Sequence, residues 1–490
     1  MKKVLCAVLA LCLLCGLTAP GAAAADVPEG YTPISTPEEL DAIRYNLGGN
    51  YILMNDIDMK DFGNWLPIGD YNAFTNAGNP NIGFSGVLDG NGYAIFNLTS
   101  VHAASVRSLN DSNFLHAGLF LSVRGGAVKN LRMENVNVSA SMLDLIGLSQ
   151  VQSGKIYGSN VAAYAGGIAA SAGEGASFLN CSVSGGVKAE ACGSEQINAY
   201  AGGFVGSSRG EDNYGAERKW NHYKGCTNTA AVSASVKTID CYDETMIPSQ
   251  GISAYAYAGG IAGGHFYNFL TRCANNGKIT VNAECQTEKK VSTSHACAGG
   301  VIGDNQYGWL INSYNTGAVE GMSTQVNDSS GLYSNKTWLG GLAGTASSAY
   351  IKGCYNTGMV KDLGSREKYV TAISANGSYI NISCCYYLNN GLLAIDGDTN
   401  WQYTHTISYA EALTDAQLKQ KDNFKGFDFE NVWNINEGMS YPALRVDTSG
   451  TLKDPDVFYD PYEGLKWWEI LPPFLQWILK WVFFGWIWMR

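Results

Sequence analysis

The chain has few charged residues and little proline. Asp, Glu, Lys and Arg make up 15 % of its 490 residues, against about 25 % in average soluble proteins. Proline occurs only 12 times, whereas glycine occurs 58 times and aromatic residues make up 12 %. This combination argues against a disordered chain, which would be rich in charge and poor in aromatics. A cationic excess is also missing, because the net charge is −11, so we expect no nucleic-acid partner.

The N-terminus has the pattern of a secretory signal. Lys2 and Lys3 precede an apolar stretch at 4–17, and three alanines at 23–25 offer small residues for cleavage. We therefore interpret 1–25 as a signal peptide and expect an exported protein at the cell surface.

The C-terminus is rich in tryptophan. We interpret 447–466 as a polar linker and 467–490 as a membrane-associating tail that forms an apolar helix. Three interpretations of the tail stay open: a spanning anchor, a helix lying in the headgroup layer, and a buried core helix. Its aromatic residues include Trp467, Trp468, Phe474, Trp477, Trp481, Trp486 and Trp488.

Internal repeats fill residues 116–390. The first recurring element is a glycine pair followed by apolar residues, and the second is an Asn-containing turn that follows 14 residues later in the clearest copies. The period there is 40 to 41 residues. Glycine pairs begin at Gly166, Gly202, Gly259, Gly299 and Gly340, and the turn asparagines are Asn228, Asn275, Asn315 and Asn356.

Short apolar runs between these turns predict strands, and a single repeat has too little surface to bury its own apolar face. Stacked repeats form a continuous core, so we predict an all-β solenoid over 26–446. The recurring asparagines are expected to stack as a ladder, each bonding to the backbone of its neighbour. At the start, Thr36, Pro37 and Glu39 predict a short capped helix that covers the open end of the solenoid.

The motifs resemble those of the GLUG-repeat family of bacterial cell-surface proteins. Gly341-Leu-Ala-Gly344 matches the Gly-Leu-any-Gly signature, and the segments 34–40, 84–95 and 433–444 resemble the flanking sequences of that family. The resemblance covers about 31–446. It implies a right-handed parallel β-helix and an adhesin-like protein. The same repeats occur upstream of the catalytic domain in immunoglobulin-A-cleaving zinc metallopeptidases, but this chain has no His-Glu-x-x-His motif.

Ten cysteines follow the predicted cleavage site, and export permits disulfides to persist. Within-repeat bridges and buried thiols are both compatible with the spacing. Bridges between repeats are disfavoured if each repeat makes two rungs, because equivalent cysteines would then lie about 9–10 Å apart. The within-repeat candidates are Cys181–Cys192, Cys226–Cys241 and Cys273–Cys285.

Other candidates for chemistry are weaker, and we expect no cofactor. Asp56, Asp58 and Asp61 offer oxygen ligands for calcium, although the family resemblance favours a strand end with its turn. Residues 206–210 match Gly-x-Ser-x-Gly but lack the strand-to-helix context of a nucleophile elbow. The six histidines are scattered and expected at the surface, so no zinc site is predicted.

These observations favour an exported, membrane-tethered, non-catalytic protein that binds a glycan or a host protein. Loops on a rigid scaffold carry ligand contacts, so the insertions at 141–160, 207–222 and 233–256 are the predicted binding segments. Outward tyrosines such as Tyr164, Tyr200 and Tyr257 either stack on sugar rings or pack on the scaffold. The alternative is a carbohydrate-active β-helix enzyme, a polysaccharide lyase or hydrolase.

Overall fold

The structure is a computed structural model, and it describes residues 27–69, 83–105, 113–143, 160–193, 195–211, 219–238, 252–285, 292–325, 334–396, 406–407 and 409–445. The predicted signal peptide 1–25, the linker 447–466 and the tail 467–490 lie outside these residues, and so does the predicted C-terminal helix. In the part of the chain that the structure describes, no helix is long and apolar enough to cross a membrane.

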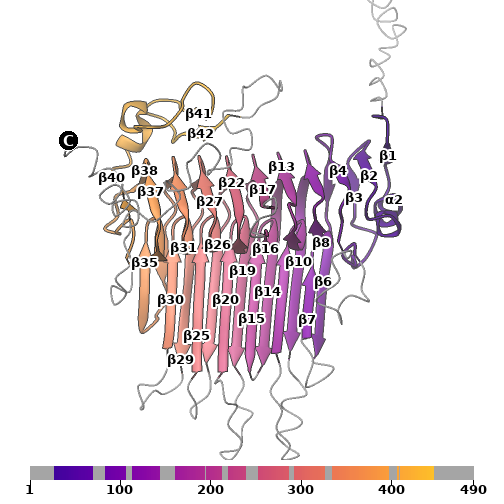
Figure 1. The fold of residues 1–490 in the computed structure, drawn as a ribbon, viewed down its shortest axis with the longest axis horizontal. Coiled ribbons are helices and arrows are strands. Elements are labelled where there is room, and N and C mark those ends of the chain that lie inside the picture. Colours follow the sequence, from indigo (N-terminus) through magenta and orange to yellow (C-terminus); the bar gives the residue numbers. More distant parts are fainter. Residues whose placement is uncertain are drawn as a thin grey trace, which may run out of the picture.

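The described chain is a parallel β-solenoid, which confirms the predicted fold class. Its strands stack along one axis from the N-terminal to the C-terminal end (Figure 1). Four parallel sheets run along this axis, and we number them I to IV in the order in which one turn of the chain visits them. Each 40-residue repeat makes one such turn, here called a rung, because β25 pairs directly with β30 and β26 with β31.

Sheets I and II each have seven strands and are joined at the glycine pairs. The strands of sheet I are β7 (Asn113–Ala117), β11 (Asn160–Gly166), β15 (Gln196–Gly202), β20 (Ile252–Gly259), β25 (Ser292–Gly299), β30 (Ser334–Gly340) and β35 (Glu367–Thr371). Those of sheet II are β8 (Phe120–Arg124), β12 (Ala169–Gly173), β16 (Val205–Arg209), β21 (Ala262–Phe266), β26 (Ile302–Gln306), β31 (Ala343–Ser347) and β36 (Ser374–Ser378).

Sheet III has eleven short strands and begins nearest the N-terminus. They are β1 (Tyr31–Ile34), β2 (Asn50–Leu53), β4 (Val87–Asp89), β9 (Ala127–Lys129), β13 (Ser177–Leu179), β17 (Asn221–Lys224), β22 (Asn268–Thr271), β27 (Trp309–Ile311), β32 (Tyr350–Lys352), β37 (Asn381–Ser383) and β39 (Thr406–Ile407).

Among the described residues sheet IV has fifteen strands, because five rungs enter it twice, before and after a turn, and five enter it once. They are β3 (Ile57–Asp58), β5 (Ala94–Phe96), β6 (Thr99–Ser105), β10 (Arg132–Leu143), β14 (Ser182–Gly193), β18 (Thr227–Asn228), β19 (Ala231–Thr238), β23 (Ala274–Asn275), β24 (Ile279–Cys285), β28 (Tyr314–Asn315), β29 (Val319–Gln325), β33 (Tyr355–Asn356), β34 (Val360–Asp362), β38 (Cys385–Leu388) and β40 (Ala410–Leu413).

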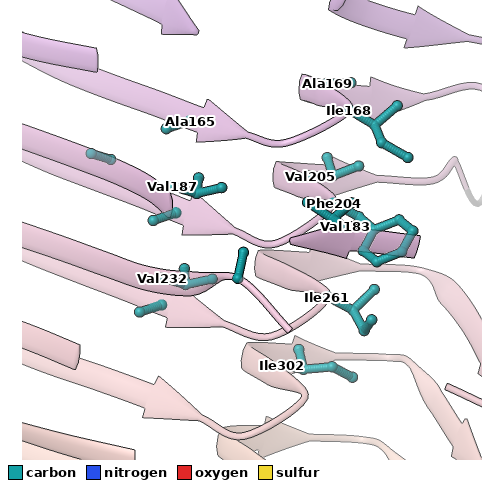
Figure 2. Packing of buried hydrophobic residues seen from close by; sticks show 14 of the residues in the cluster. Ala165, Ile168, Ala169, Val183, Val187, Phe204, Val205, Val232, Ile261 and Ile302 are labelled. Atoms are coloured by element: carbon teal, nitrogen blue, oxygen red, sulfur yellow. The ribbon is translucent and has the colours of Figure 1, made fainter. Parts of the chain in front are cut away.

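The side chains of the core are small on one side of the glycine pairs and larger on the other. Sheets I and IV face each other through small side chains, such as Ala163 and Ala165 of β11 opposite the β14 residues Ala189 and Ala191. Beyond the pairs, sheets II, III and IV enclose larger side chains. Figure 2 shows Ile168, Phe204 and Ile261, which follow the glycines one per rung and point into this wider part.

The turn asparagines form the predicted ladder inside the core. Asn275 Nδ2 donates to Asn315 Oδ1 at 2.8 Å, and Asn315 Nδ2 donates to Asn356 Oδ1 at 2.8 Å. Each asparagine also holds its own turn, since Asn315 Oδ1 accepts from the Gly317 backbone N–H at 3.1 Å. The bonds between rungs therefore join side chain to side chain, whereas we expected side chain to neighbouring backbone.

The predicted N-terminal helix is present as α2 (Pro37–Asp41), which a single 3-10 turn, η1 (Ala42–Tyr45), continues. Thr36 and Glu39 form a reciprocal capping box. Leu40 and Ile43 are buried in the solenoid core cluster. The helix therefore covers apolar surface at the N-terminal end, as predicted.

At the other end, a small module packs its own apolar cluster against the last rungs. It contains η3 (Gln417–Lys419), η4 (Lys421–Asn423) and the antiparallel pair β41 (Trp433–Asn434) and β42 (Ala443–Leu444). Trp433 is fully buried beside Tyr355, with ring centroids 5.8 Å apart. In Figure 1 this module lies beside the sheet III and sheet IV strands of the last rungs.

Candidate binding surface

An aromatic surface lines the outer corner between sheets II and III. Tyr267 and Tyr307 occupy the turn itself, one rung apart, and their rings stack with centroids 4.9 Å apart at 25°. Phe266 packs its ring edge against Tyr267 at 4.6 Å. We call this set the corner surface, and its members are Phe266, Tyr267, Tyr307, Trp309, Tyr350 and Tyr379.

The rings of the corner surface point outward. In sheet III, Trp309 and Tyr350 alternate with the fully buried residues Leu310 and Ile351, so they stand on the opposite face. Their rings stack with centroids 4.2 Å apart. Tyr307 keeps 42 % of its surface exposed and Tyr379 keeps 47 %. Contiguous exposed apolar surface with a polar rim marks interaction sites on soluble proteins.

Three of these tyrosines have a left-handed backbone. Tyr267, Tyr307 and Tyr379 have φ of 52°, 52° and 55°. This conformation costs a residue with a side chain about 1–2 kcal/mol. Gly125 stands at the equivalent position of an earlier rung with φ of 68°. Glycine therefore also allows this turn to form, so the turn does not require the tyrosine rings.

The tyrosines that precede the glycine pairs form a second stack, on the outer face of sheet I. Tyr164, Tyr200 and Tyr257 lie one rung apart, with ring centroids at 5.1 and 5.0 Å and nearly parallel planes. Their ring faces are covered by one another, and burial raises the pKa of Tyr164 to about 12. These tyrosines pack on the scaffold, which was one of the two interpretations from the sequence.

Among the described residues, the carboxylate of Asp304 faces this second stack. Asp304 of β26 accepts hydrogen bonds from Gln306 Nε2 at 2.7 Å and Thr345 Oγ1 at 2.5 Å. Burial raises the pKa of Asp304, although these hydrogen bonds oppose the shift. Glycoside hydrolysis normally uses two carboxyl groups, so Asp304 by itself does not constitute a hydrolase site.

The histidines depart from the expectation of surface positions. His265 is 3 % exposed and lies inside sheet II, with its Nδ1 3.0 Å from Asn305 Oδ1. His116 stacks on Tyr164 at 5.0 Å, and burial lowers its pKa to about 4. The physical reason is that a solenoid buries polar side chains when neighbouring rungs supply partners for them. No group of three metal-ligating side chains occurs among the described residues.

The cysteines at the first position of each repeat line up inside the core. The register places Cys181, Cys226 and Cys273 on successive rungs, followed by Ser313 and Cys354 on the next two. Neighbouring strands lie about 4.8 Å apart, so the distance of 9–10 Å expected from two rungs per repeat is wrong. All five side chains are buried.

The structure does not bring together the two candidate disulfide pairs that it describes. Cys181 precedes β14 and Cys192 lies near the far end of that extended strand, roughly 30 Å away. Cys273 and Cys285 are likewise separated by β23 and β24. A disulfide needs Cα atoms within about 7 Å. For the pair Cys226–Cys241, Cys241 lies outside the described residues.

Two of the three calcium candidates, Asp56 and Asp58, accept hydrogen bonds from the next rung, and Asp61 is exposed. Asp56 Oδ1 accepts from the Ala94 backbone N–H at 2.7 Å. Asp58 Oδ1 accepts from Asn97 Nδ2 at 2.8 Å and from the Lys60 backbone N–H at 3.0 Å. These bonds tie the strand end and turn to the next rung, which is a structural use of both carboxylates.

The predicted binding insertions lie largely outside the described residues. Of 141–160 the structure describes the two ends, and of 207–222 it describes 207–211 and 219–222. The flanks of 233–256 are strands β19 and β20. Within 207–211, Ser208 lies in a buried network and accepts from Tyr223 Oη at 2.6 Å, so it is not an exposed nucleophile. The corner surface was not predicted, because its tyrosines follow no sequence motif.

Solved structures to which this chain is similar include a candidate immunoglobulin A1 protease and an IgA1 protease. A candidate immunoglobulin A1 protease from Bacteroides ovatus is 17 % identical, with a TM-score of 0.40, over 84 % of this chain and 91 % of that chain. An IgA1 protease is 12 % identical, with a TM-score of 0.39, over 88 % of this chain and 26 % of that chain. No family model and no curated protein matches the sequence, so the GLUG resemblance remains a prediction.

Proposed function

We propose that this chain is an exported, membrane-tethered surface protein that binds its ligand without chemically changing it. The observation that carries the proposal is the corner surface, where Tyr307 and Tyr379 stay exposed at turn positions that glycine would satisfy. A rigid parallel solenoid supports these rings on paired strands, so little conformational entropy is lost when a ligand binds.

The binding part of the proposal is tested with the purified full-length protein. It is immobilised and exposed to a panel of glycans, mucins and matrix proteins, and each retained ligand is recovered and analysed by mass spectrometry. Retention of an intact ligand is the expected result. Recovery of a shortened ligand would instead support the carbohydrate-active enzyme, and retention of nothing would overturn the binding function.

The tethering part rests on the tryptophan-rich sequence 467–490, outside the described residues. Full-length protein and a chain ending at Val446 are expressed with the same N-terminus, and membranes are sedimented from both cultures. The full-length protein is expected in the membrane fraction and the shorter one in the supernatant. Sedimentation of the shorter chain with membranes would contradict a role for the tail.

A further inference from the structure

We propose that the corner surface binds an uncharged, linear glycan that lies along the solenoid axis. This inference rests on the proposed binding function and adds the ligand class and its direction. Three observations carry it: the repetition of the rings from rung to rung, their position on strained backbone, and the chemistry of the polar groups between them.

The rings repeat along the axis with the spacing of the rungs. Phe266 and Tyr267 belong to the rung of β21, Tyr307 to that of β26, and Tyr379 follows β36 two rungs later. In the rung of β31 between them the turn residue is Ser348, and the ring is that of Tyr350 in β32. Four consecutive rungs at about 4.8 Å each make a strip roughly 15 Å long. A linear polymer with a short repeat can contact every rung of such a strip, whereas a compact ligand contacts one or two.

The tyrosines occupy turn positions at which other residue types also allow the chain to fold. Gly125, Glu174 and Ser348 occupy the equivalent turn position in other rungs with φ of 68°, 58° and 50°. Gly210 occupies it in the rung before that of Tyr267, without a left-handed φ. The backbone N–H of Gly210 bonds to Phe266 O in the same way that the N–H of Tyr267 bonds to Gln306 O. Since the ladder bond forms with either residue, the ring itself is the feature that distinguishes these rungs.

The row of side chains next to the rings is uncharged, although Gln306 Nε2 donates to the carboxylate of Asp304 two residues earlier in β26. Gln306, Ser347 and Ser378 occupy the outward row of sheet II next to the corner, and the two serine hydroxyls are 2.8 Å apart. Among the described residues, cationic groups stand at the margins, where Arg209 lies 5.2 Å over the Phe266 ring and Lys352 ends β32. Aromatic faces with hydroxyl and amide groups match the apolar faces and hydroxyls of a neutral sugar chain.

A peptide fits this surface less well. Peptides that bind a β-sheet commonly add a strand at an open edge. The strands under the corner, β21, β26 and β31, are paired on both sides. Their backbone groups are therefore already used, and only side-chain contacts remain for a ligand.

The experiment measures binding of the full-length protein to cellohexaose, maltohexaose and mannohexaose by isothermal titration calorimetry. The disaccharide of each series and a polygalacturonate hexamer serve as comparison ligands. The variant Tyr307→Asn removes the ring and keeps a residue that tolerates the left-handed turn. Tyr45→Ala removes an aromatic ring that is 84 % exposed elsewhere on the chain and serves as the matched control.

We expect at least one neutral hexasaccharide to bind, about tenfold or more tighter than its disaccharide. Tyr307→Asn should weaken this binding by about tenfold or more without lowering the unfolding midpoint, a separation that a purely structural ring would not produce. Tyr45→Ala should leave binding unchanged.

Two results would overturn the inference while leaving the binding function standing. One is retention of a mucin or matrix protein with no neutral hexasaccharide bound, and the other is tighter binding of polygalacturonate than of any neutral chain. Equal affinity of Tyr307→Asn and the unmodified protein would show that the glycan binds elsewhere. Failure of every ligand in both experiments would remove the proposed function as well.

Discussion

Gly300 lies directly against Asn315, so that a Cβ atom on Gly300 would stand 2.2 Å from Asn315 Cγ. The same contact recurs in neighbouring rungs, where Gly260 meets Asn275 and Gly341 meets Asn356. The two motifs that recur 14 residues apart are therefore two halves of one contact. Glycine opens the bend between sheets I and II, and the asparagine amide occupies the space that it leaves.

Replacing Gly300 by alanine should destabilise the solenoid by about 3 kcal/mol, because the added methyl group meets the Gly341 carbonyl as well as Asn315. Thermal unfolding followed by circular dichroism measures the effect. Gly186→Ala is the matched control, since nothing lies within 4 Å of its Cβ position. An equal unfolding midpoint for both variants would contradict the close contact.

Replacing Asn315 by alanine should cost about 3 kcal/mol, because it leaves buried partners without hydrogen bonds. The Gly317 backbone N–H loses its acceptor, and the Asn275 amide loses the oxygen 2.8 Å away. Denaturant unfolding provides the measurement. Asn276→Ala is the control because that side chain is exposed and bonds to the side chains of Thr316 and Tyr314 outside the ladder. The ladder would carry little stability if the two variants unfolded together.

Stability should fall as the pH decreases from about 6.5 towards 4. Burial lowers the pKa of His265 to about 3, whereas the unfolded side chain titrates near 6.5. The unfolded chain therefore takes up the proton first, and the stability that is fully present above pH 6.5 is lost on acidification, at up to about 1.4 kcal/mol per pH unit.

Unfolding of the unmodified protein and of His265→Gln, measured between pH 7 and 4, checks this dependence. The variant should lose less stability across this range, because it lacks the group that the unfolded chain protonates. Parallel pH profiles for the two proteins would show that His265 does not contribute.

The cysteine ladder should stay unreactive in the folded protein. Burial raises the pKa of the Cys181 thiol to about 12 and that of Cys226 well above its usual value, so little thiolate forms at neutral pH. Labelling with iodoacetamide and peptide mass spectrometry should find Cys181, Cys226 and Cys273 modified only after unfolding. If any of them remained unlabelled in denaturant without reductant, a disulfide at that cysteine would be established.

The sequence predicted features that depend on local spacing. The cap at Thr36, the glycine pairs and the Asn315 ladder each follow from residue types at short, repeated distances, and the structure confirms all three. A ladder of this kind can be predicted without knowing the shape of one rung. Equivalent residues of successive repeats stack whatever path the chain takes between them.

Features that depend on the path of the chain within one rung could not be predicted from the sequence. The contact between successive cysteines such as Cys226 and Cys273 requires the number of rungs in a repeat, which the period alone does not provide. The burial of His265 and the exposure of Tyr307 depend on which face of a short strand each occupies. Within strands of three to five residues, alternation is too brief to decide this from the sequence.

Because one repeat forms one rung, the length of the chain determines the length of the solenoid along its axis. Each additional 40-residue repeat lengthens the rod by one strand spacing, about 4.8 Å, and leaves the cap at α2 and the C-terminal module unchanged. Gain or loss of whole repeats would thus adjust the distance between the two ends in small, equal steps. The length of the solenoid is thus set by the number of repeats that the gene encodes.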